Sequence, residues 1–199
     1  MNPDFYRKPT LELSKQLLGA ELVHETKEGV LSGKIVEVEA YLGPEDRAAH
    51  SFGGRRTKRT EVMFGNPGHA YLYMIYGIHI CLNIVSGPVG KPEAILLRAV
   101  EPIRGMERMS GNRGFGHLEK LSYRKRKQLT SGPGKLVKAL DIPMDLYGHD
   151  MTEPPLYIRP AGTPIPAEEI AEGPRIGIEN TGEAREYPYR FWIHGNPYV

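Results

Sequence analysis

Residues 21–42 read ELVHETKEGVLSGKIVEVEAYL, and this stretch decides the fold expected for the 199-residue chain. Two segments rich in β-forming residues, 21–26 and 30–42, flank a short turn that contains Gly29, so the stretch predicts a β-hairpin. Apolar and polar side chains alternate along the second segment. Because successive side chains of a strand point to opposite faces, one face is expected to be apolar and the other to carry Glu37, Glu39 and Tyr41.

The composition outside this hairpin predicts a single domain that spans residues 1–199. Hydrophobic residues make up 40% of the chain and charged residues 25%, which suits one globular core. The chain has 23 Gly and 17 Pro residues, which favour short elements and many turns over a coiled coil or a helical bundle. The amino terminus is polar, and the apolar runs are too short to cross a bilayer. We therefore expect a cytoplasmic protein without a membrane segment.

The remaining elements form a mixed α and β pattern along the chain. The expected elements are a short amphipathic helix at 10–18, an irregular connection at 43–68, strands within 69–87 that turn near Tyr76 and Gly77, a central strand at 94–100, a helical section at 103–142 with Ser131 as a helix cap, and short strands at 155–160, 175–180 and 189–195. Arg98 is the one charged residue inside the central strand. A cation in that position needs a partner.

Charge is unevenly distributed, although the formal net charge is only +2. Residues 47–59 carry five Lys or Arg and no acid, and residues 101–138 carry ten basic against three acidic residues. The balance reverses over 141–199, with four basic and ten acidic residues. Such a positive middle suits a polyanion, while a solvated helix face with a mobile loop would give the same pattern. Residues 131–135 add a possible phosphate contact, although a glycine-rich helix start without a ligand is also common.

The sequence gives little support for a disulfide or a metal site. The chain has one cysteine, Cys81, which excludes an intramolecular disulfide, and its apolar neighbours predict a buried thiol in a reducing compartment. Glu39, Asp46 and His50 lie close in sequence, but their spacing matches no metal motif. We expect neither a metal nor an organic cofactor.

Glu39 is the candidate general base. A carboxylate held beside an aromatic wall can have a raised pKa and can then accept a proton from water. On the strand face opposite the apolar row, Glu39 has Tyr41 as its neighbour two residues on. An exposed strand glutamate remains the alternative, and for an isolated residue it is the more common case.

Flat side chains are concentrated in one short segment, which contains Tyr71, Tyr73, Tyr76 and His79. Tyr76 falls at the expected hairpin tip beside Gly77, where a ring projects from the surface. Such a ring can enter a stack of bases and occupy the space of an extruded nucleotide. Ordinary core tyrosines at strand spacing are the alternative, which is favoured for Tyr71.

Several blocks together resemble the alkyladenine (3-methyladenine) DNA glycosylase family. They are VEVEAYLGPEDRAAHS (36–51), MFGNPGHAYLYMIYGIHICLNI (63–84), LLRAVEP (96–102) and SGPGKL (131–136), and the match extends in order from Asp4 to Val199. The resemblance implies an α+β domain with a curved antiparallel sheet, short helices and a protruding β-hairpin that enters the DNA minor groove. It also implies excision of alkylated or deaminated purines, including 3-methyladenine, 7-methylguanine and hypoxanthine, as the first step of base excision repair.

The same resemblance implies a role for each matching residue. Glu39 corresponds to the general base that activates the water attacking the deoxyribose C1′. The residues that correspond to the base pocket are Tyr41, Ala48, His50, Tyr73 and Asn83. Those that correspond to DNA contacts are the intercalating Tyr76, Arg98 near the target nucleotide, and Lys135 at a phosphate.

Double-stranded DNA containing damaged purines is therefore the expected partner, bound by a monomer that associates with the nucleoid if the source is bacterial. No lysine occupies the Glu39 motif, so water is the expected nucleophile and an abasic site the product. Two alternatives remain from the residues alone. One is a noncatalytic module that binds damaged or single-stranded DNA, and the other is a glycosidase or nucleosidase that acts on small molecules.

Overall fold

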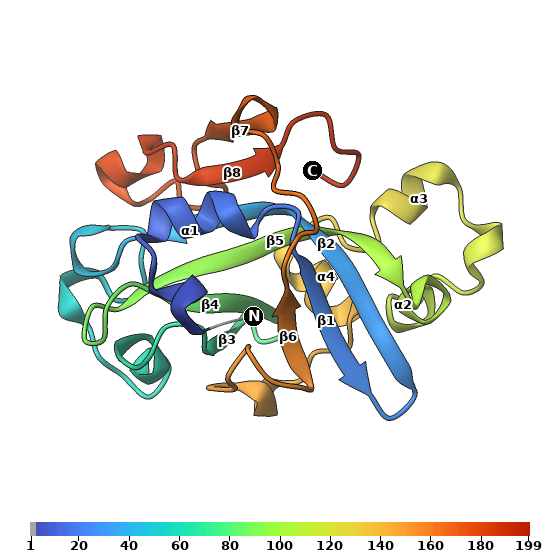
Figure 1. The fold of residues 1–199 in the computed structure, drawn as a ribbon, viewed down its shortest axis with the longest axis horizontal. Helices are drawn as coiled ribbons and strands as arrows, with labels where there is room; N and C mark the ends of the chain where they lie inside the picture. The colour runs from blue at the N-terminus through green and yellow to red at the C-terminus, as the bar shows by residue number, and fades with distance from the viewer. Residues whose placement is uncertain (1–2) are drawn as a thin grey trace.

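A curled antiparallel sheet organises the computed structural model, which describes residues 3–199 (Figure 1). The order of its main path is β3-β4-β5-β2-β1-β6, and β8 joins β2 and carries β7. The strands are β1 (Glu21–Thr26), β2 (Gly29–Tyr41), β3 (Ala70–Ile75), β4 (His79–Ser86), β5 (Glu93–Arg104), β6 (Leu156–Arg159), β7 (Ile170–Gly173) and β8 (Arg190–Ile193).

Strand β2 is the centre of this sheet because it pairs with three partners. Its first half pairs with β1 from Gly29 to Lys34, its second half pairs with β8 from Glu37 to Glu39, and β5 runs along its other edge. The β2–β5 register shifts near Ser32 and again around Glu37. Because such bulges bend a strand and increase its twist, they curl the sheet around the middle of β2.

Two short helices pack on the sheet, and two more lie together at the right-hand side of the molecule in Figure 1. They are α1 (Thr10–Leu17), α2 (Met106–Asn112), α3 (Tyr123–Lys127) and α4 (Pro133–Ala139). α1 packs on β2, β5 and β8, whereas α4 packs on β4 and β5. Single 3-10 turns occupy Pro3–Arg7, Gly43–Glu45, Phe52–Gly54, Glu61–Phe64, Leu118–Lys120, Met144–Leu146, Ala167–Glu169 and Gly182–Glu186.

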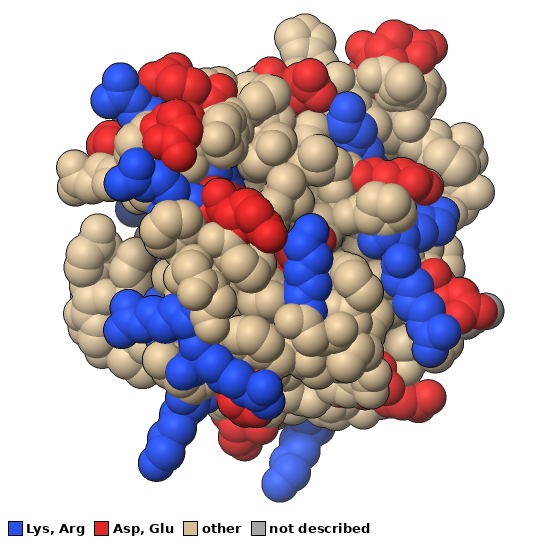
Figure 2. Space-filling model, turned by 90° about the vertical axis from the view of Figure 1, so that its left-hand side faces the viewer, with Lys and Arg blue, Asp and Glu red and all other residues tan. Residues whose placement is uncertain are grey.

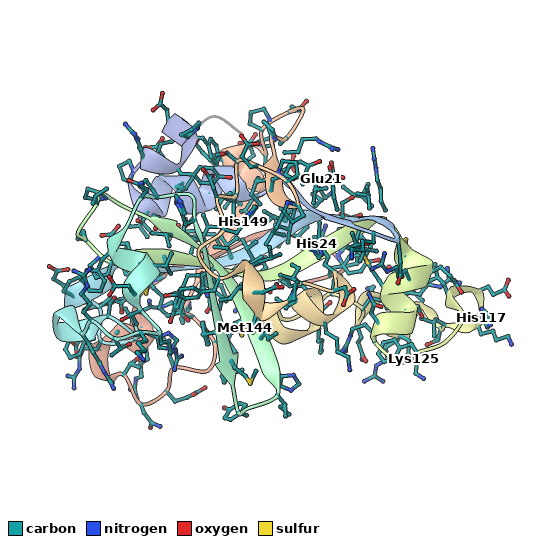
Figure 3. The ribbon with its side chains drawn as sticks, turned by 90° about the horizontal axis from the view of Figure 1, so that it is seen from below. Glu21, His24, His117, Lys125, Met144 and His149 are labelled. Carbon is teal, nitrogen blue, oxygen red and sulfur yellow. The ribbon has the colours of Figure 1, made fainter. Side chains whose placement is uncertain are left out.

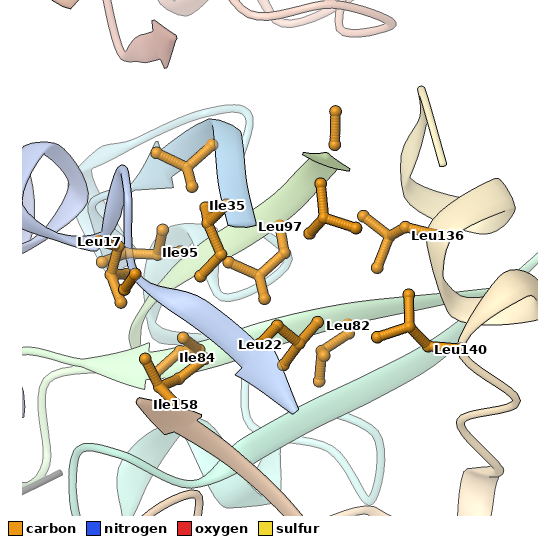
Figure 4. Packing of buried hydrophobic residues seen from close by; sticks show 14 of the residues in the cluster. Leu17, Leu22, Ile35, Leu82, Ile84, Ile95, Leu97, Leu136, Leu140 and Ile158 are labelled. Atoms are coloured by element: carbon orange, nitrogen blue, oxygen red, sulfur yellow. The ribbon is translucent and has the colours of Figure 1, made fainter. Parts of the chain in front are cut away.

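One apolar core joins the sheet to its helices (Figure 4). The central members, labelled there, are Leu17, Leu22, Ile35, Leu82, Ile84, Ile95, Leu97, Leu136, Leu140 and Ile158. Val36, Val38 and Ala40 of β2 also belong to this core, as the alternation of the sequence predicted. The residues between them on β2 lie on the opposite face, and that face is buried as well.

The expected fold class is confirmed: the chain forms one α+β domain with a curved antiparallel sheet, short helices and a protruding hairpin. The helix at 10–18 appears as α1, and Cys81 is buried as predicted. Within residues 3–199 no helix has the length and apolar character needed to cross a bilayer.

Three local predictions were wrong. The strand predicted at 94–100 extends to Arg104, so the helical section begins only at Met106. The segment 175–180 is a loop with bends and a turn and without strand pairing, and the strand in this region is β7 instead.

Ser131 does not cap α4. The N-cap is Gly132, whose φ of 129° suits glycine, and the Ser131 hydroxyl donates instead to the Lys127 carbonyl oxygen at 2.5 Å.

The bulge at Gly33 provides a test of the packing between β2 and β5. A Cβ at Gly33 would lie 2.7 Å from Val100 Cγ2 and 3.0 Å from the Glu101 carbonyl oxygen, so Gly33→Ala forces the two strands apart. We expect the free energy of unfolding to fall by about 1–3 kcal/mol in urea titrations. A Cβ at Gly111 in α2 meets no atom within 4 Å, so Gly111→Ala is the control and should stabilise by up to about 1 kcal/mol. Equal stabilities of the two variants would contradict this account.

Candidate functional site

Glu39 lies in the second half of β2 with a side chain that is 0% exposed. Its Oε1 atom accepts a hydrogen bond from the Ile176 N–H at 2.8 Å and lies 3.2 Å from Arg98 Nη1. Its Oε2 atom accepts from the Tyr41 hydroxyl at 2.8 Å. Three donors from three separate segments therefore hold this carboxylate in one orientation.

The environment of Glu39 makes it a stronger base than an exposed glutamate. Burial raises the pKa of the Glu39 carboxyl above its ordinary value, while Arg98, the Ile176 N–H and the Tyr41 hydroxyl each oppose the shift by favouring the charged form. Since a higher pKa brings a carboxylate closer to the range in which it removes a proton from water, the site suits general base chemistry.

Arg98 of β5 lies between two carboxylates. Its Nε atom is 3.1 Å from Glu37 Oε1, and its Nη1 atom contacts Glu39. Glu37 also pairs with Arg190 of β8 at 2.8 Å. The expectation that Arg98 needs a partner is confirmed, and its guanidinium joins β5 to the buried face of β2.

A cavity of about 930 Å³ opens beside these groups. The residues that the sequence assigned to the base pocket and the DNA contacts all contribute to its wall, namely Tyr41, Ala48, His50, Tyr73, Tyr76, Asn83, Arg98 and Lys135. Glu39 lies directly behind this wall, because its three partners all line the cavity. The fold thus brings every predicted site residue to one place.

Aromatic side chains form one side of the cavity. His50 Nδ1 lies 2.8 Å from the Tyr71 hydroxyl, and the His50 ring meets the Tyr73 ring edge to face with centroids 4.6 Å apart. The Arg59 guanidinium stacks over Tyr73 at 4.7 Å. Burial together with Arg59 and Arg55 lowers the pKa of His50 to about 4. The imidazole is therefore neutral at pH 7 and adds no charge to the cavity.

Two polar positions in the wall are already fixed by the protein. The Asn83 side-chain nitrogen donates to the Tyr71 carbonyl oxygen at 3.0 Å, which orients its amide. The Ala48 N–H donates to Asp46 Oδ1 at 3.0 Å. Within the described chain the Ala48 carbonyl accepts no hydrogen bond, so it is the backbone group there that a ligand can use.

A buried ion pair ties the C-terminal part of the chain to the site. Arg175 donates from its two Nη atoms to the two oxygens of Asp46, and also to the Ala40 carbonyl oxygen at 2.8 Å. The Arg175 guanidinium lies over the Tyr41 ring at 4.7 Å. Because Ile176 follows directly, this pair positions the N–H that reaches Glu39.

The β3–β4 hairpin ends in a strained and exposed tip. Tyr76 adopts a left-handed φ of 53° and its side chain is 87% exposed. Gly77 also has a positive φ, and the apolar side chains of Met74 and Ile78 are exposed on either side. Without packing partners on the protein, the Tyr76 ring is available to insert into another molecule.

The sequence missed several groups that build the site. Arg59 had a signal, because it belongs to the basic stretch 47–59. The Asp46–Arg175 pair and the Ile176 N–H had none, since the segment 175–180 was expected to be a strand. Among residues 3–199, no group of three or more His, Cys, Asp or Glu side chains is placed to hold a metal ion.

The residue blocks at this site agree with comparisons to known proteins. The family model described as methylpurine-DNA glycosylase matches residues 4–197. Proteins named "Putative 3-methyladenine DNA glycosylase" are similar over nearly the whole chain. The one from Oceanobacillus iheyensis is 52% identical over 98% of this chain and 92% of its own length, that from Bacillus licheniformis 54% over 98% and 94%, and that from Bacillus subtilis 51% over 98% and 93%.

The buried Asp46–Arg175 pair gives a stability prediction. Arg175→Met removes the cation and leaves the Asp46 carboxylate buried without a partner, so we expect the free energy of unfolding to fall by about 3–5 kcal/mol. Arg185→Met is the matched control because Arg185 pairs with Glu186 on the surface, where loss of a pair costs less than about 1 kcal/mol. Chemical denaturation of both variants measures the difference. Similar losses in both would show that the buried pair does not anchor the loop.

Proposed function

Because the chain belongs to the methylpurine-DNA glycosylase family, we propose that it excises 3-methyladenine, 7-methylguanine and hypoxanthine from double-stranded DNA with water as the nucleophile. Family membership makes the protein a DNA repair hydrolase that acts on N-glycosidic bonds. The observation that carries the proposed mechanism is the buried Glu39 carboxylate, held by three donors that line an aromatic cavity.

The proposed enzyme is a monomer whose single domain comprises residues 1–199. If the source is bacterial, like the compared relatives, its substrate places the activity in the cytoplasm with the chromosome.

Base flipping is assigned to the hairpin tip. A glycosylase cannot reach C1′ of a stacked nucleotide, so the damaged nucleotide has to leave the helix. The exposed Tyr76 ring enters the minor groove and occupies the gap in the base stack. Lys135 and Arg98 at the cavity wall contact the DNA backbone around the flipped nucleotide.

The cavity then encloses the extruded purine. Tyr41, His50 and Tyr73 all line it, and the His50 and Tyr73 rings meet edge to face. Electron-rich tyrosine faces favour cationic purines such as 3-methyladenine or 7-methylguanine, and a neutral His50 does not repel them. Asn83 crowds the position that the 2-amino group of guanine would take, and backbone groups at Ala48 and His50 contact the purine edge.

Glu39 performs the chemical step in this mechanism. Its Oε2 atom accepts one hydrogen bond, from Tyr41, and keeps a lone pair for a proton of the attacking water. The water oxygen bonds to C1′ while the bond from C1′ to the purine nitrogen breaks, and the electron pair leaves with the base. The carboxylate also stabilises the positive charge that develops on the sugar. A cationic purine leaves as a neutral molecule, whereas hypoxanthine must gain a proton.

The Glu39→Gln variant tests whether the protein is an enzyme or a binding module. We expect the variant to lose about 10²–10⁴-fold in single-turnover base release, because an amide cannot accept the proton. Its affinity for the damaged duplex should be retained. A duplex with one hypoxanthine, cleaved by alkali at abasic sites, gives the readout, and Glu12→Gln on α1 is the control that keeps full activity.

A noncatalytic module predicts a different result. Wild-type protein would then bind damaged DNA but release neither hypoxanthine nor methylated purines. Release of bases from free nucleosides would instead support a small-molecule nucleosidase.

The pH dependence of base release follows from the shifted pKa of Glu39. Since burial raises that pKa, the rate should fall with decreasing pH around a midpoint above the ordinary value of 4.5. His50 stays neutral down to about pH 4 and does not account for this limb. The folded state binds the Glu39 proton more tightly than the unfolded chain, so protonation of this group stabilises the fold and does not itself cause acid unfolding. Single-turnover rates between pH 4 and 8 measure the midpoint, and a flat profile over this range would exclude Glu39 as the base.

A further inference from the structure

A group of cations next to the cavity has no role in the proposed mechanism. Residues 120–138 carry seven Lys or Arg and no acid. Lys120, Arg124, Lys125 and Lys127, on α3 and the turn before it, are here called the basic arm. Lys120, Arg124 and Lys125 are exposed.

The basic arm is set apart by how closely its cations follow one another, since other exposed cations of residues 3–199, such as Lys58 and Lys138, also form no ion pair. On the opposite end of the molecule, several Lys and Arg side chains lie next to Asp or Glu side chains, and others project without one (Figure 2). Arg47–Glu183 and Arg56–Glu61 are surface ion pairs of the described chain. Among the ion pairs of residues 3–199, none involves a member of the basic arm. Concentrated like charge is unfavourable unless an anion is bound.

The chain holds the arm in place without neutralising it. Lys127 lies over the Tyr123 ring at 4.4 Å, and the Ser122 side chain accepts from the Lys125 N–H at the start of α3. After the arm, Leu129 is fully buried and the Thr130 hydroxyl donates to the Val100 carbonyl oxygen of β5. The arm is therefore a fixed part of the surface rather than a loose tail.

The C-terminal end of the basic arm adjoins the wall of the cavity. The segment that contains it starts after Arg113 and ends at Ser131, and both of these residues line the cavity. The Ser131 hydroxyl donates directly to the carbonyl oxygen of Lys127. Seen from below the view of Figure 1, Lys125 lies on the side toward which the β3–β4 hairpin projects (Figure 3). A duplex that receives Tyr76 therefore runs close to the arm.

Arg113 supports the same conclusion. It lines the cavity, and within residues 3–199 its buried Nε atom has no hydrogen-bond partner and its guanidinium forms no ion pair. The Arg113 guanidinium lies over the Phe115 ring at 5.2 Å, so its charge has a ring contact but no anion. An anionic group beside it would therefore be stabilised.

We propose that the basic arm binds the phosphates of the duplex that flanks the damaged nucleotide, outside the site at which the base is removed. The proposal rests on the proposed function, because that function supplies the duplex. Lysine and arginine on one short exposed helix contact phosphates without reading bases, so the arm contributes affinity that is independent of sequence and of damage. Its part is to keep the enzyme on undamaged DNA while Tyr76 tests each position.

The test measures how strongly salt weakens binding to an undamaged duplex, and compares the wild-type protein with a variant of the basic arm. The variant Lys120→Gln/Arg124→Gln/Lys125→Gln removes three exposed cations and spares Arg126, whose Nε atom donates to the Leu121 carbonyl oxygen at 3.2 Å. Each lost phosphate contact lowers the slope of log affinity against log salt by about 1, so a slope smaller by about 2–3 is expected. Affinity at 0.1 M salt should fall by about tenfold or more. Fluorescence anisotropy from 50 to 200 mM salt gives both values.

A second variant controls for net charge. This control variant is Lys8→Gln/Lys15→Gln/Lys34→Gln, which removes the same amount of positive charge. Its three lysines lie just before α1, in α1 and in β2, and each has an acidic partner. Its slope should stay within about 1 of the wild-type slope. Equal slopes for the two triple variants, or a wild-type slope in the arm variant, would overturn the proposal and leave another acidic molecule as the partner of the arm. Failure of the proposed function gives a different result, since wild-type protein would then release no base from damaged DNA whatever its slope.

Discussion

The structure depends on keeping one carboxylate inside the protein and still able to act as a base. Burial of Glu39 alone would favour the protonated acid, and Arg98, the Ile176 N–H and the Tyr41 hydroxyl oppose that effect. The balance matters because full neutralisation of the carboxylate would remove its chemistry, whereas exposure to water would lower its basicity. Moving any of the three donors away from Glu39 would therefore change its proton affinity.

These donors explain features of the fold that the core alone does not require. Tyr41 reaches Glu39 from two residues along β2, Arg98 comes from β5, and Ile176 comes from a loop far along the chain. The loop is held by the Arg175 pair with Asp46, so the connection after β2 and the C-terminal part of the chain meet at the site. The bulges between β2 and β5 bend the sheet at the same place. The site and the bend of the sheet therefore lie at the same part of β2.

The sequence predicted those features of the fold that depend on the pattern of neighbouring residues. Alternation along 30–42 predicted β2 and placed Glu39 opposite the apolar core, and the Tyr76–Gly77 turn predicted the hairpin tip. The pattern could not show that a loop from 175–180 covers the polar face of β2, because Arg175 and Ile176 act through long-range contacts and one of them through its backbone. The serine and glycines at 131–134 did not distinguish a Ser131 cap from a Gly132 cap, because both residue types occur there. The roles of the pocket residues came from family resemblance, and the structure adds that they share one cavity.

The charged groups of this protein lie in two different environments, one buried and one exposed to water. Inside, Arg98 lies within 3.2 Å of Glu39 and Glu37, with little water between the charges, so dissolved salt screens these interactions weakly. Outside, the cations of the basic arm face water, where a Debye length of about 8 Å at physiological salt limits their reach. Ionic strength should therefore govern how long the protein stays on DNA and leave the proton affinity of Glu39 nearly constant. A repair enzyme with this division can search long stretches of undamaged duplex by weak surface contacts, while cleavage depends only on the base that enters its cavity.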